Sequence, residues 1–122
     1  MRLGDATPIL RIFDEAAARA FYLDFLGFTV CFEHRFAPDL PLYMGIARDG
    51  CTLHLSGHQG DTTPGTRIRI AVDGIDALAE ELGSRDHPGI RIGRPEDTPW
   101  GERAITVTDP FGNRLTFHQR SA

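Results

Sequence analysis

An internal repeat is the feature of this sequence that most constrains its fold. Each half of the 122-residue chain begins with a β-type segment, passes through an aspartate into an amphipathic helical segment, and ends in three β-type segments joined by turns. One such unit can bury only one sheet face under one helix, so we expect two units to pack together. We place the repeat units at about residues 6–56 and 66–119, joined by a polar linker at 57–65, in a single domain spanning 1–122.

The first half predicts a strand, a helix and then three strands. Apolar residues at helical spacing predict a helix from Glu15 to Leu26, with Asp14 as its N-cap and Gly27 as its stop. The dipeptide Asp49-Gly50 predicts a hairpin turn between two strands. The predicted strands of this half are Thr7 to Phe13, Phe28 to Arg35, Leu42 to Arg48 and Cys51 to Ser56, with a loop at 38–41.

The second half repeats this order. Ile68 and Ile70 alternate with Arg67 and Arg69, which is typical of a strand with one buried face. We expect Asp73 to open a helix that runs from Ile75 to about Ser84, and Asp109 to Asn113 to form a tight turn in which Gly112 takes a positive φ. The predicted strands are Thr66 to Val72, Ile90 to Gly93, Glu102 to Thr108 and Arg114 to Gln119.

Composition and charge exclude several classes of protein. The formal net charge is -4, and all 13 basic residues are arginine, which argues against a general nucleic-acid binder with a basic stripe. No apolar stretch approaches the roughly 20 residues that span a bilayer, so we expect no membrane partner. Without a visible secretory signal, we expect a cytoplasmic protein with free thiols. Cys31 and Cys51 are interpreted as small, buried apolar residues.

Two segments carry a resemblance to a known family. Residues 10–28 read L-R-I-F-D-x-x-x-A-x-x-F-Y-x-D-F-L-G-F, and residues 98–117 read T-P-W-G-x-x-x-x-x-x-x-D-P-F-G-N-x-L-x-F. In this order and separation they resemble the glyoxalase / bleomycin-resistance superfamily, also named the vicinal oxygen chelate superfamily, and bleomycin-resistance proteins most of all. The resemblance implies an α+β fold in which two βαβββ modules form a curved, mixed eight-stranded sheet with helices on its outer face.

The resemblance also implies where a metal would be held. Metalloenzymes of this superfamily use four strand residues on the concave face, and those positions fall on Thr7, His54, Arg67 and Thr116. A guanidinium has no lone pair to give a metal, and two hydroxyls with one imidazole make a poor transition-metal site. We therefore expect no metal and no cofactor. A relocated site around His54 is the alternative, because three more histidines lie in or near strands: His34, His58 and His118.

Strand alternation predicts a polar concave face. Leu53, Leu55, Leu115 and Phe117 are expected under the helices, which turns the arginines, threonines and histidines of these strands inward. The arginines are as well explained by ion pairs with Asp or Glu as by a ligand. The aromatics Phe13, Phe21, Tyr22, Phe25 and Phe28 are interpreted as core.

Trp100 lies in a loop and is the only tryptophan. An exposed loop aromatic can stack on a planar ligand, and in bleomycin-resistance proteins an aromatic here lines a drug groove at a dimer interface. A satellite core or dimer contact explains Trp100 equally well. The candidate ligand-binding residues are Trp100, His54, Arg67, Thr116, His118, Phe32, Phe36 and Tyr43.

No motif of a nucleophilic enzyme is present, so no catalytic residue is predicted. The favoured hypothesis is a metal-free homodimeric protein that sequesters a small molecule, with a bleomycin-family antibiotic as the candidate. One alternative is a metal-dependent lyase, isomerase or dioxygenase with a non-standard site around His54. The other is a metabolite-sensing module that reads an anionic ligand with Arg67, Arg69 and His54.

Overall fold

Two mixed sheets with the same strand order organise the chain in its computed structural model, which describes residues 1–121. In the N-terminal module the sheet order is β1-β4-β3-β2, and in the C-terminal module it is β5-β8-β7-β6. The first strand of each module runs parallel to the last, and the other pairs are antiparallel. The strands are β1 (Ile9–Arg11), β2 (Thr29–His34), β3 (Tyr43–Arg48), β4 (Cys51–Ser56), β5 (Arg67–Ala71), β6 (Glu96–Asp97), β7 (Glu102–Thr108) and β8 (Arg114–Arg120).

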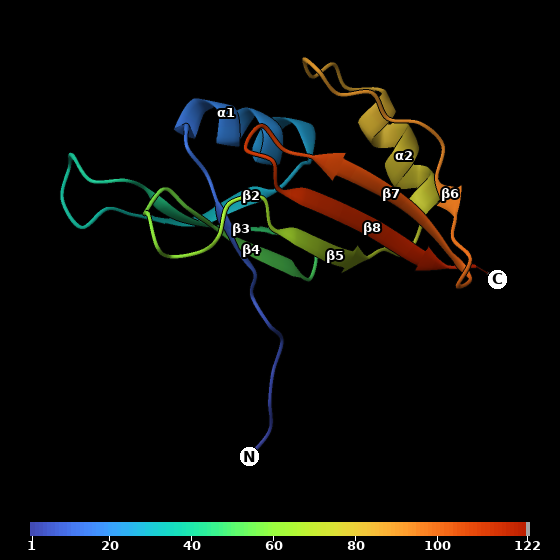
Figure 1. Ribbon diagram of the computed structural model, residues 1–122, viewed down its shortest axis with the longest axis horizontal. Helices are drawn as coiled ribbons and strands as arrows, with labels where there is room; N and C mark the ends of the chain where they lie inside the picture. The colour runs from blue at the N-terminus through green and yellow to red at the C-terminus, as the bar shows by residue number, and fades with distance from the viewer. Residues whose placement is uncertain (122) are drawn as a thin grey trace.

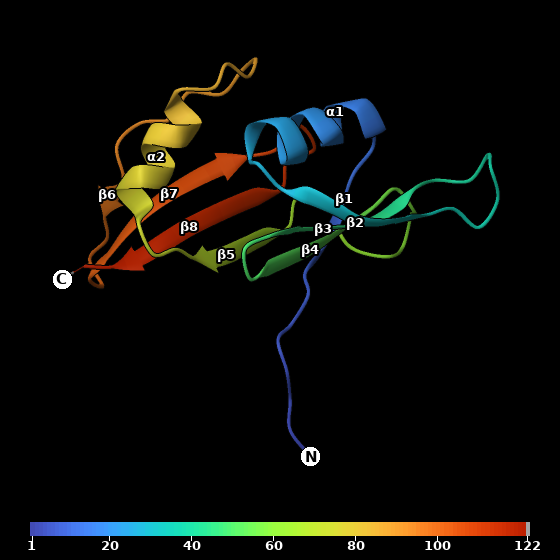
Figure 2. The same ribbon diagram turned by 180° about the vertical axis from the view of Figure 1, so that it is seen from behind.

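The helices cover one side of both sheets and leave the other side open (Figures 1 and 2). They are α1 (Glu15–Arg19), which continues directly as the π-helix η1 (Ala20–Phe25), and α2 (Ile75–Gly83). The residues of the last strands that were predicted to lie under the helices are buried: Leu53, Leu55, Leu115 and Phe117 are at most 5% exposed. The α+β fold with two βαβββ modules is thereby confirmed, with the eight strands divided four to each sheet.

The first helix differs from its prediction in its second half. Asp14 caps it as expected, accepting a hydrogen bond from the amide of Ala17 at 2.8 Å, but from Ala20 the helix widens into a π-helix. Four aromatic and aliphatic side chains of this stretch and of the residue that follows it are buried: Phe21, Tyr22, Phe25 and Leu26.

The second helix begins at Ile75 as predicted, but the prediction of its cap was wrong. Asp73 does not cap α2. The N-cap is Gly74 in a left-handed conformation, and the side-chain oxygen of Gln119 accepts hydrogen bonds from the amides of Gly74 and Ile75. The acceptor comes from β8, 44 residues away from Ile75, so no local pattern could reveal it.

Three further predictions need correction. Residues Ile90 to Gly93 form no strand; Ile90 and Ile92 pack half-buried against the core from a loop, and the edge strand is β6 instead. Phe13 is 61% exposed rather than core, beneath the guanidinium of Arg11. Cys31 is exposed, as are all six residues of the edge strand β2. Both cysteines are free thiols, as predicted.

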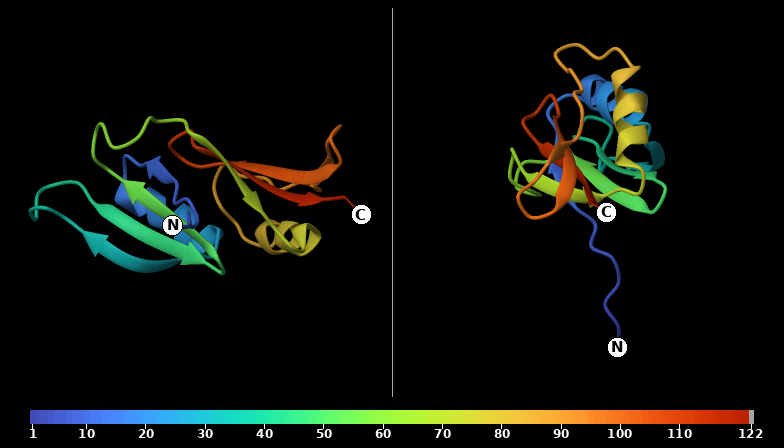
Figure 3. Two further views of the ribbon diagram at one scale, coloured as in Figure 1. Left: turned by 90° about the horizontal axis from the view of Figure 1, so that it is seen from below. Right: turned by 90° about the vertical axis from the view of Figure 1, so that its right-hand side faces the viewer.

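A buried polar network joins the two modules. The carboxylate of Asp109 accepts hydrogen bonds from the Tyr22 hydroxyl at 2.6 Å and from the Asn113 side-chain amide at 2.8 Å. The same amide of Asn113 donates to the carbonyl of Arg11 on β1. We name this network, Tyr22, Asp109 and Asn113, the inter-module lock. Figure 3 shows the modules side by side with the N-terminal segment leading away from them.

No helix within the described residues is both long and apolar enough to cross a membrane. The single-domain prediction, which runs to residue 122, extends one residue beyond those described.

Candidate functional site

The open side of the two sheets carries all eight residues predicted to bind a ligand, but in two separate groups. Phe32, Tyr43 and His54 belong to the sheet of the N-terminal module, with Phe36 just beyond β2. Arg67, Thr116 and His118 belong to the sheet of the C-terminal module, with Trp100 in the loop before β7. We name the first group, with Gly45, the aromatic face. We name the second group, with Arg69, Glu102, Thr106 and Arg114, the arginine face.

The four family metal positions do not make a metal site. His54 has its Nδ1 within 2.7 Å of the Tyr43 hydroxyl on the aromatic face. On the other sheet the Nε of Arg67 donates to Thr116 Oγ1 at 3.4 Å, and Thr7 is exposed ahead of β1. A guanidinium that donates to a threonine hydroxyl offers no lone pair to a cation. This donor set does not fit a transition metal.

A relocated metal site would need a cluster of suitable ligands. Among residues 1–121 no group of three or more His, Cys, Asp or Glu side chains could hold a metal ion. His118 and Glu102 form a pair only, with Nδ1 and Oε2 lying 3.1 Å apart. His34 and His58 instead meet the ring of Phe36 edge-on, at centroid distances of 4.6 and 5.7 Å.

The aromatic face is built on a glycine. A Cβ at Gly45 would lie 2.2 Å from the ring of Phe32, so the ring packs directly over the backbone of β3. Gly45 is the register partner of both Phe32 and His54, which places the three residues in one row across β2, β3 and β4. Phe32 meets the imidazole of His54 edge-on at 5.2 Å, and Tyr43 meets it at 5.3 Å. The sequence analysis missed Gly45, although a glycine inside a strand signals close approach of another group.

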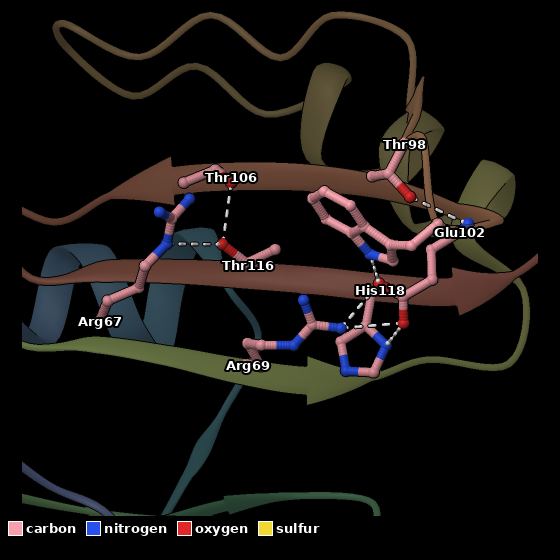
Figure 4. A network of polar contacts seen from close by, with 8 residues as sticks. Arg67, Arg69, Thr98, Glu102, Thr106, Thr116 and His118 are labelled. Carbon is pink, nitrogen blue, oxygen red and sulfur yellow. Dashed lines mark hydrogen bonds and ion pairs between the residues drawn. The ribbon is translucent and has the colours of Figure 1, made fainter.

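The arginine face is organised by a carboxylate that the sequence analysis also missed. Glu102 accepts hydrogen bonds from Arg69 at 2.7 and 2.8 Å and from the indole N–H of Trp100 at 2.5 Å (Figure 4). The carboxylate of Glu102 also lies 3.1 Å from Nδ1 of His118. The hydrogen bond from Arg69, followed by that from Trp100, lowers the pKa of Glu102 below its usual value. Glu102 therefore stays ionised and holds three side chains of different strands and loops together.

Trp100 is exposed and yet fixed. Its side chain is 64% exposed, while its N–H is held by Glu102, so the indole cannot rotate freely. It lines a groove of about 620 Å³ on the open side of the second sheet, together with Arg67, Thr106 and Thr116. The two threonine hydroxyls are hydrogen-bonded to each other at 2.9 Å. A planar molecule entering this groove meets an aromatic surface, hydroxyls and a cation.

The two arginines of β5 differ in their partners. Arg69 is paired with Glu102, as the ion-pair interpretation predicted. Arg67 contacts only a threonine hydroxyl, and within residues 1–121 no carboxylate lies at ion-pair distance from it. The expectation of a basic concave face therefore holds for Arg67 and not for Arg69.

A second cleft, of about 760 Å³, lies between the modules. Its lining is mixed: Phe28, Leu53 and Phe117 contribute apolar surface, and the ion pair of Arg48 and Glu81 contributes charge. None of the eight predicted site residues lines it.

Comparison with solved structures identifies the fold. An antibiotic-binding protein from Streptomyces sp. CB03234, TnmS3, is 25% identical, with 99% of each chain covered and a TM-score of 0.77. A bleomycin-binding protein complexed with bleomycin is 24% identical, with 98% of this chain and 100% of that chain covered and a TM-score of 0.74. A bleomycin resistance determinant encoded on the transposon Tn5 is 22% identical, with 98% and 100% covered and a TM-score of 0.71.

The family was identified by comparing the sequence with models of known protein families. No match was found among curated proteins. A family model described as glyoxalase superfamily protein matches residues 2–122, nearly the whole chain. That match agrees with the two modules, their shared strand order and the solved structures similar to them, and this chain therefore belongs to the glyoxalase superfamily.

Proposed function

We propose that this protein binds and sequesters a small molecule on the open side of its sheets, without a metal-dependent step. The observation that carries the proposal is the exposed indole of Trp100, held in place by Glu102 at a groove of about 620 Å³. A fixed aromatic surface costs little ordering when a planar ligand stacks on it. The similarity to two proteins whose names state antibiotic or bleomycin binding supports the same class of ligand.

Fluorescence of the single tryptophan tests this proposal. Bleomycin and a set of planar aromatic antibiotics are titrated into the protein, and thermal shift is measured in parallel, because a ligand that binds only the folded state raises the melting temperature. We expect at least one compound to change Trp100 emission and to raise the melting temperature of wild type but not of Trp100→Ala. A control variant, Phe13→Ala, removes an exposed aromatic far along the chain and should bind as wild type does. Absence of any response at high micromolar concentrations contradicts the proposal.

We further propose that the working form is a homodimer. The strands β1 and β5 are edges of their sheets, and each chain keeps its aromatic face and its arginine face on different sheets. A second copy can cover the edges and bring one chain's aromatic face toward the other's arginine face. Analytical ultracentrifugation at micromolar concentration should give a dimer mass; a monomer both with and without ligand contradicts this part.

The absence of a metal stays a prediction, and metal analysis of the purified protein tests it. A stoichiometric transition metal that is lost in His54→Ala would favour the enzyme alternative. A cytoplasmic location and the lack of a nucleic-acid partner also stay predictions.

A further inference from the structure

Two neighbouring arginines that have no ion-pair partner among residues 1–121 bear on the charge of the ligand. Arg67 on β5 and Arg114 on β8 are register partners in the parallel pairing, so their side chains leave the sheet on the same side. Both are exposed, and among residues 1–121 neither has a carboxylate at ion-pair distance. Like charges directly opposite each other in a sheet repel. An anion between them would relieve this repulsion.

Three other arginines of the sheets are paired, whereas Arg11 on β1 and Arg120 on β8 also have no carboxylate at ion-pair distance within residues 1–121. Arg48 on β3 makes a two-point contact with Glu81 at 2.7 Å, and Arg103 on β7 contacts Asp76 at 2.7 Å. Arg69, two residues from Arg67 on the same strand and the same side, is paired with Glu102. Although acidic residues are in excess in this chain, 17 against 13, no carboxylate among residues 1–121 lies at ion-pair distance from Arg67 or Arg114.

The charged residues that line the groove differ between its two ends. Arg67 lines it from β5, at one edge of the sheet. Glu96 and Asp97 of β6 line it at the opposite edge, together with Arg94 just before β6. Trp100 and the threonines lie along the same groove, with Thr106 and Thr116 on the two central strands. Figure 4 shows the guanidinium of Arg67 beside these two threonines and away from the cluster around Glu102. The β6 edge carries two carboxylates and one guanidinium, whereas the β5 edge carries Arg67, so an anionic group is favoured at the β5 edge.

We propose that the groove selects a planar aromatic anion, whose ring stacks on Trp100 and whose carboxylate, sulfonate or similar group binds the guanidinium of Arg67. Arg114 raises the positive potential at that end. Arg69 takes no part, because Glu102 neutralises it, and neither does His54, which lies on the other sheet. This inference rests on the proposed small-molecule binding at the same groove and adds the charge of the ligand to it.

Three naphthalene compounds of matched size test the charge preference. The probes are naphthalene-2-sulfonate, the uncharged naphthalene-2-sulfonamide, and the cation 2-(aminomethyl)naphthalene, each titrated at pH 7 and low salt. Affinity is measured by calorimetry, and the single indole N–H signal of Trp100 in ¹⁵N NMR reports the site. We expect the sulfonate to bind roughly tenfold more tightly than the sulfonamide, since a hydrogen bond to a charged group contributes more than a neutral one.

Two variants locate the preference. Arg67→Gln should bring the sulfonate and the sulfonamide to about equal affinity and leave the Trp100 response to both. The matched control is Arg2→Gln, which removes the same charge from the exposed N-terminal segment and should keep the preference.

The outcomes separate this inference from the proposed function. Equal affinity for all three probes, or a preference for the cation, overturns the anion inference while the binding groove stands. A sulfonate preference that survives Arg67→Gln overturns the role of Arg67. No binding and no shift of the Trp100 signal with any probe overturns both the inference and the groove as a binding site.

Discussion

The two open faces differ although the backbones beneath them repeat. The row across the N-terminal sheet reads Ile9, His54, Gly45, Phe32, and the equivalent row across the C-terminal sheet reads Arg69, Thr116, Thr106. The first is held by ring packing on a bare backbone, and the second by hydrogen bonds and ion pairs around Glu102. A duplicated fold thus supplies two surfaces of different chemistry. One is suited to apolar contact and the other to polar and charged groups.

The largest effect is expected where both faces share support, at the inter-module lock. Asp109 is 4% exposed and accepts four hydrogen bonds, from Tyr22, Phe111 and twice from Asn113. Asp109→Ala leaves buried donors without a partner and should lower the free energy of unfolding by at least about 3 kcal/mol.

Urea denaturation followed by Trp100 emission in one module and by Tyr43 NMR signals in the other measures this loss. The two transitions should coincide, because the lock makes the modules unfold together. The exposed Asp24→Ala should change stability by less than about 0.5 kcal/mol. Separate transitions in the wild-type protein would show that the faces are independent.

The lock should also give stability a dependence on alkaline pH. Burial, and then the charge of Asp109, raise the pKa of Tyr22 far above its ordinary value. The folded state thus keeps a proton that the unfolded state loses near pH 10, so stability is full below that pH and falls as the pH rises above it. The chain has no lysine, and burial also raises the pKa of Tyr43 and that of the Cys51 thiol.

Tyr22→Phe should cost about 1–2 kcal/mol at pH 8 and reduce the decline between pH 9.5 and 11, which urea denaturation measures at each pH. Tyr43→Phe is the matched control and should keep most of the decline. An equal decline in wild type and Tyr22→Phe would contradict the role of Tyr22.

A smaller loss of stability is expected from a substitution that disturbs only the aromatic face. Gly45→Ala places a Cβ where the Phe32 ring now lies, and should displace the ring from His54 at a cost of roughly 1 kcal/mol. The His54 ring signals in NMR should shift while the Trp100 indole signal stays unchanged. In a Phe32→Ala background the same substitution should cost almost nothing, because the ring it meets is absent. An unchanged His54 signal in Gly45→Ala would rule out the packing described above.

The smallest effect is spectroscopic and confined to the arginine face. Arg69 lowers the pKa of Glu102, so the tie to Trp100 persists at pH values above the ordinary glutamate pKa of about 4.3 and is lost only below it. Its contribution to stability is likewise present above that pH and lost as the pH falls through the pKa of the folded state. Trp100 emission should show an acid transition in wild type and none in Glu102→Gln.

Glu96→Gln is the control for this titration. Glu96 lies in the same groove without an ion-pair partner among residues 1–121, so its removal should leave the transition in place. The same transition in Glu102→Gln would assign it to another group.

Much of the fold was predictable because its signals are local. The alternation of Ile68 and Ile70 with Arg67 and Arg69 was enough to orient β5, and Gly27 and Gly112 take the positive φ values that their turns require. The buried Leu53 and Leu55 follow from the same period of two. The candidate site was predictable only as a set of residues on the open side. Their division into two faces was not, because it depends on which sheet each strand joins.

What the sequence by itself determined is the repeat, the family and the unsuitability of Thr7, His54, Arg67 and Thr116 for a metal, since these depend on residue type and order. Only the tertiary structure decided which side chains meet. Glu102 joins Arg69 across 33 residues, and Tyr22 joins Asp109 across 87. It also placed Arg67 beside Arg114, with no carboxylate among residues 1–121 at ion-pair distance from either. Such contacts depend on strand register and on the packing of the modules, whose effects act over distances in the chain that no local pattern spans.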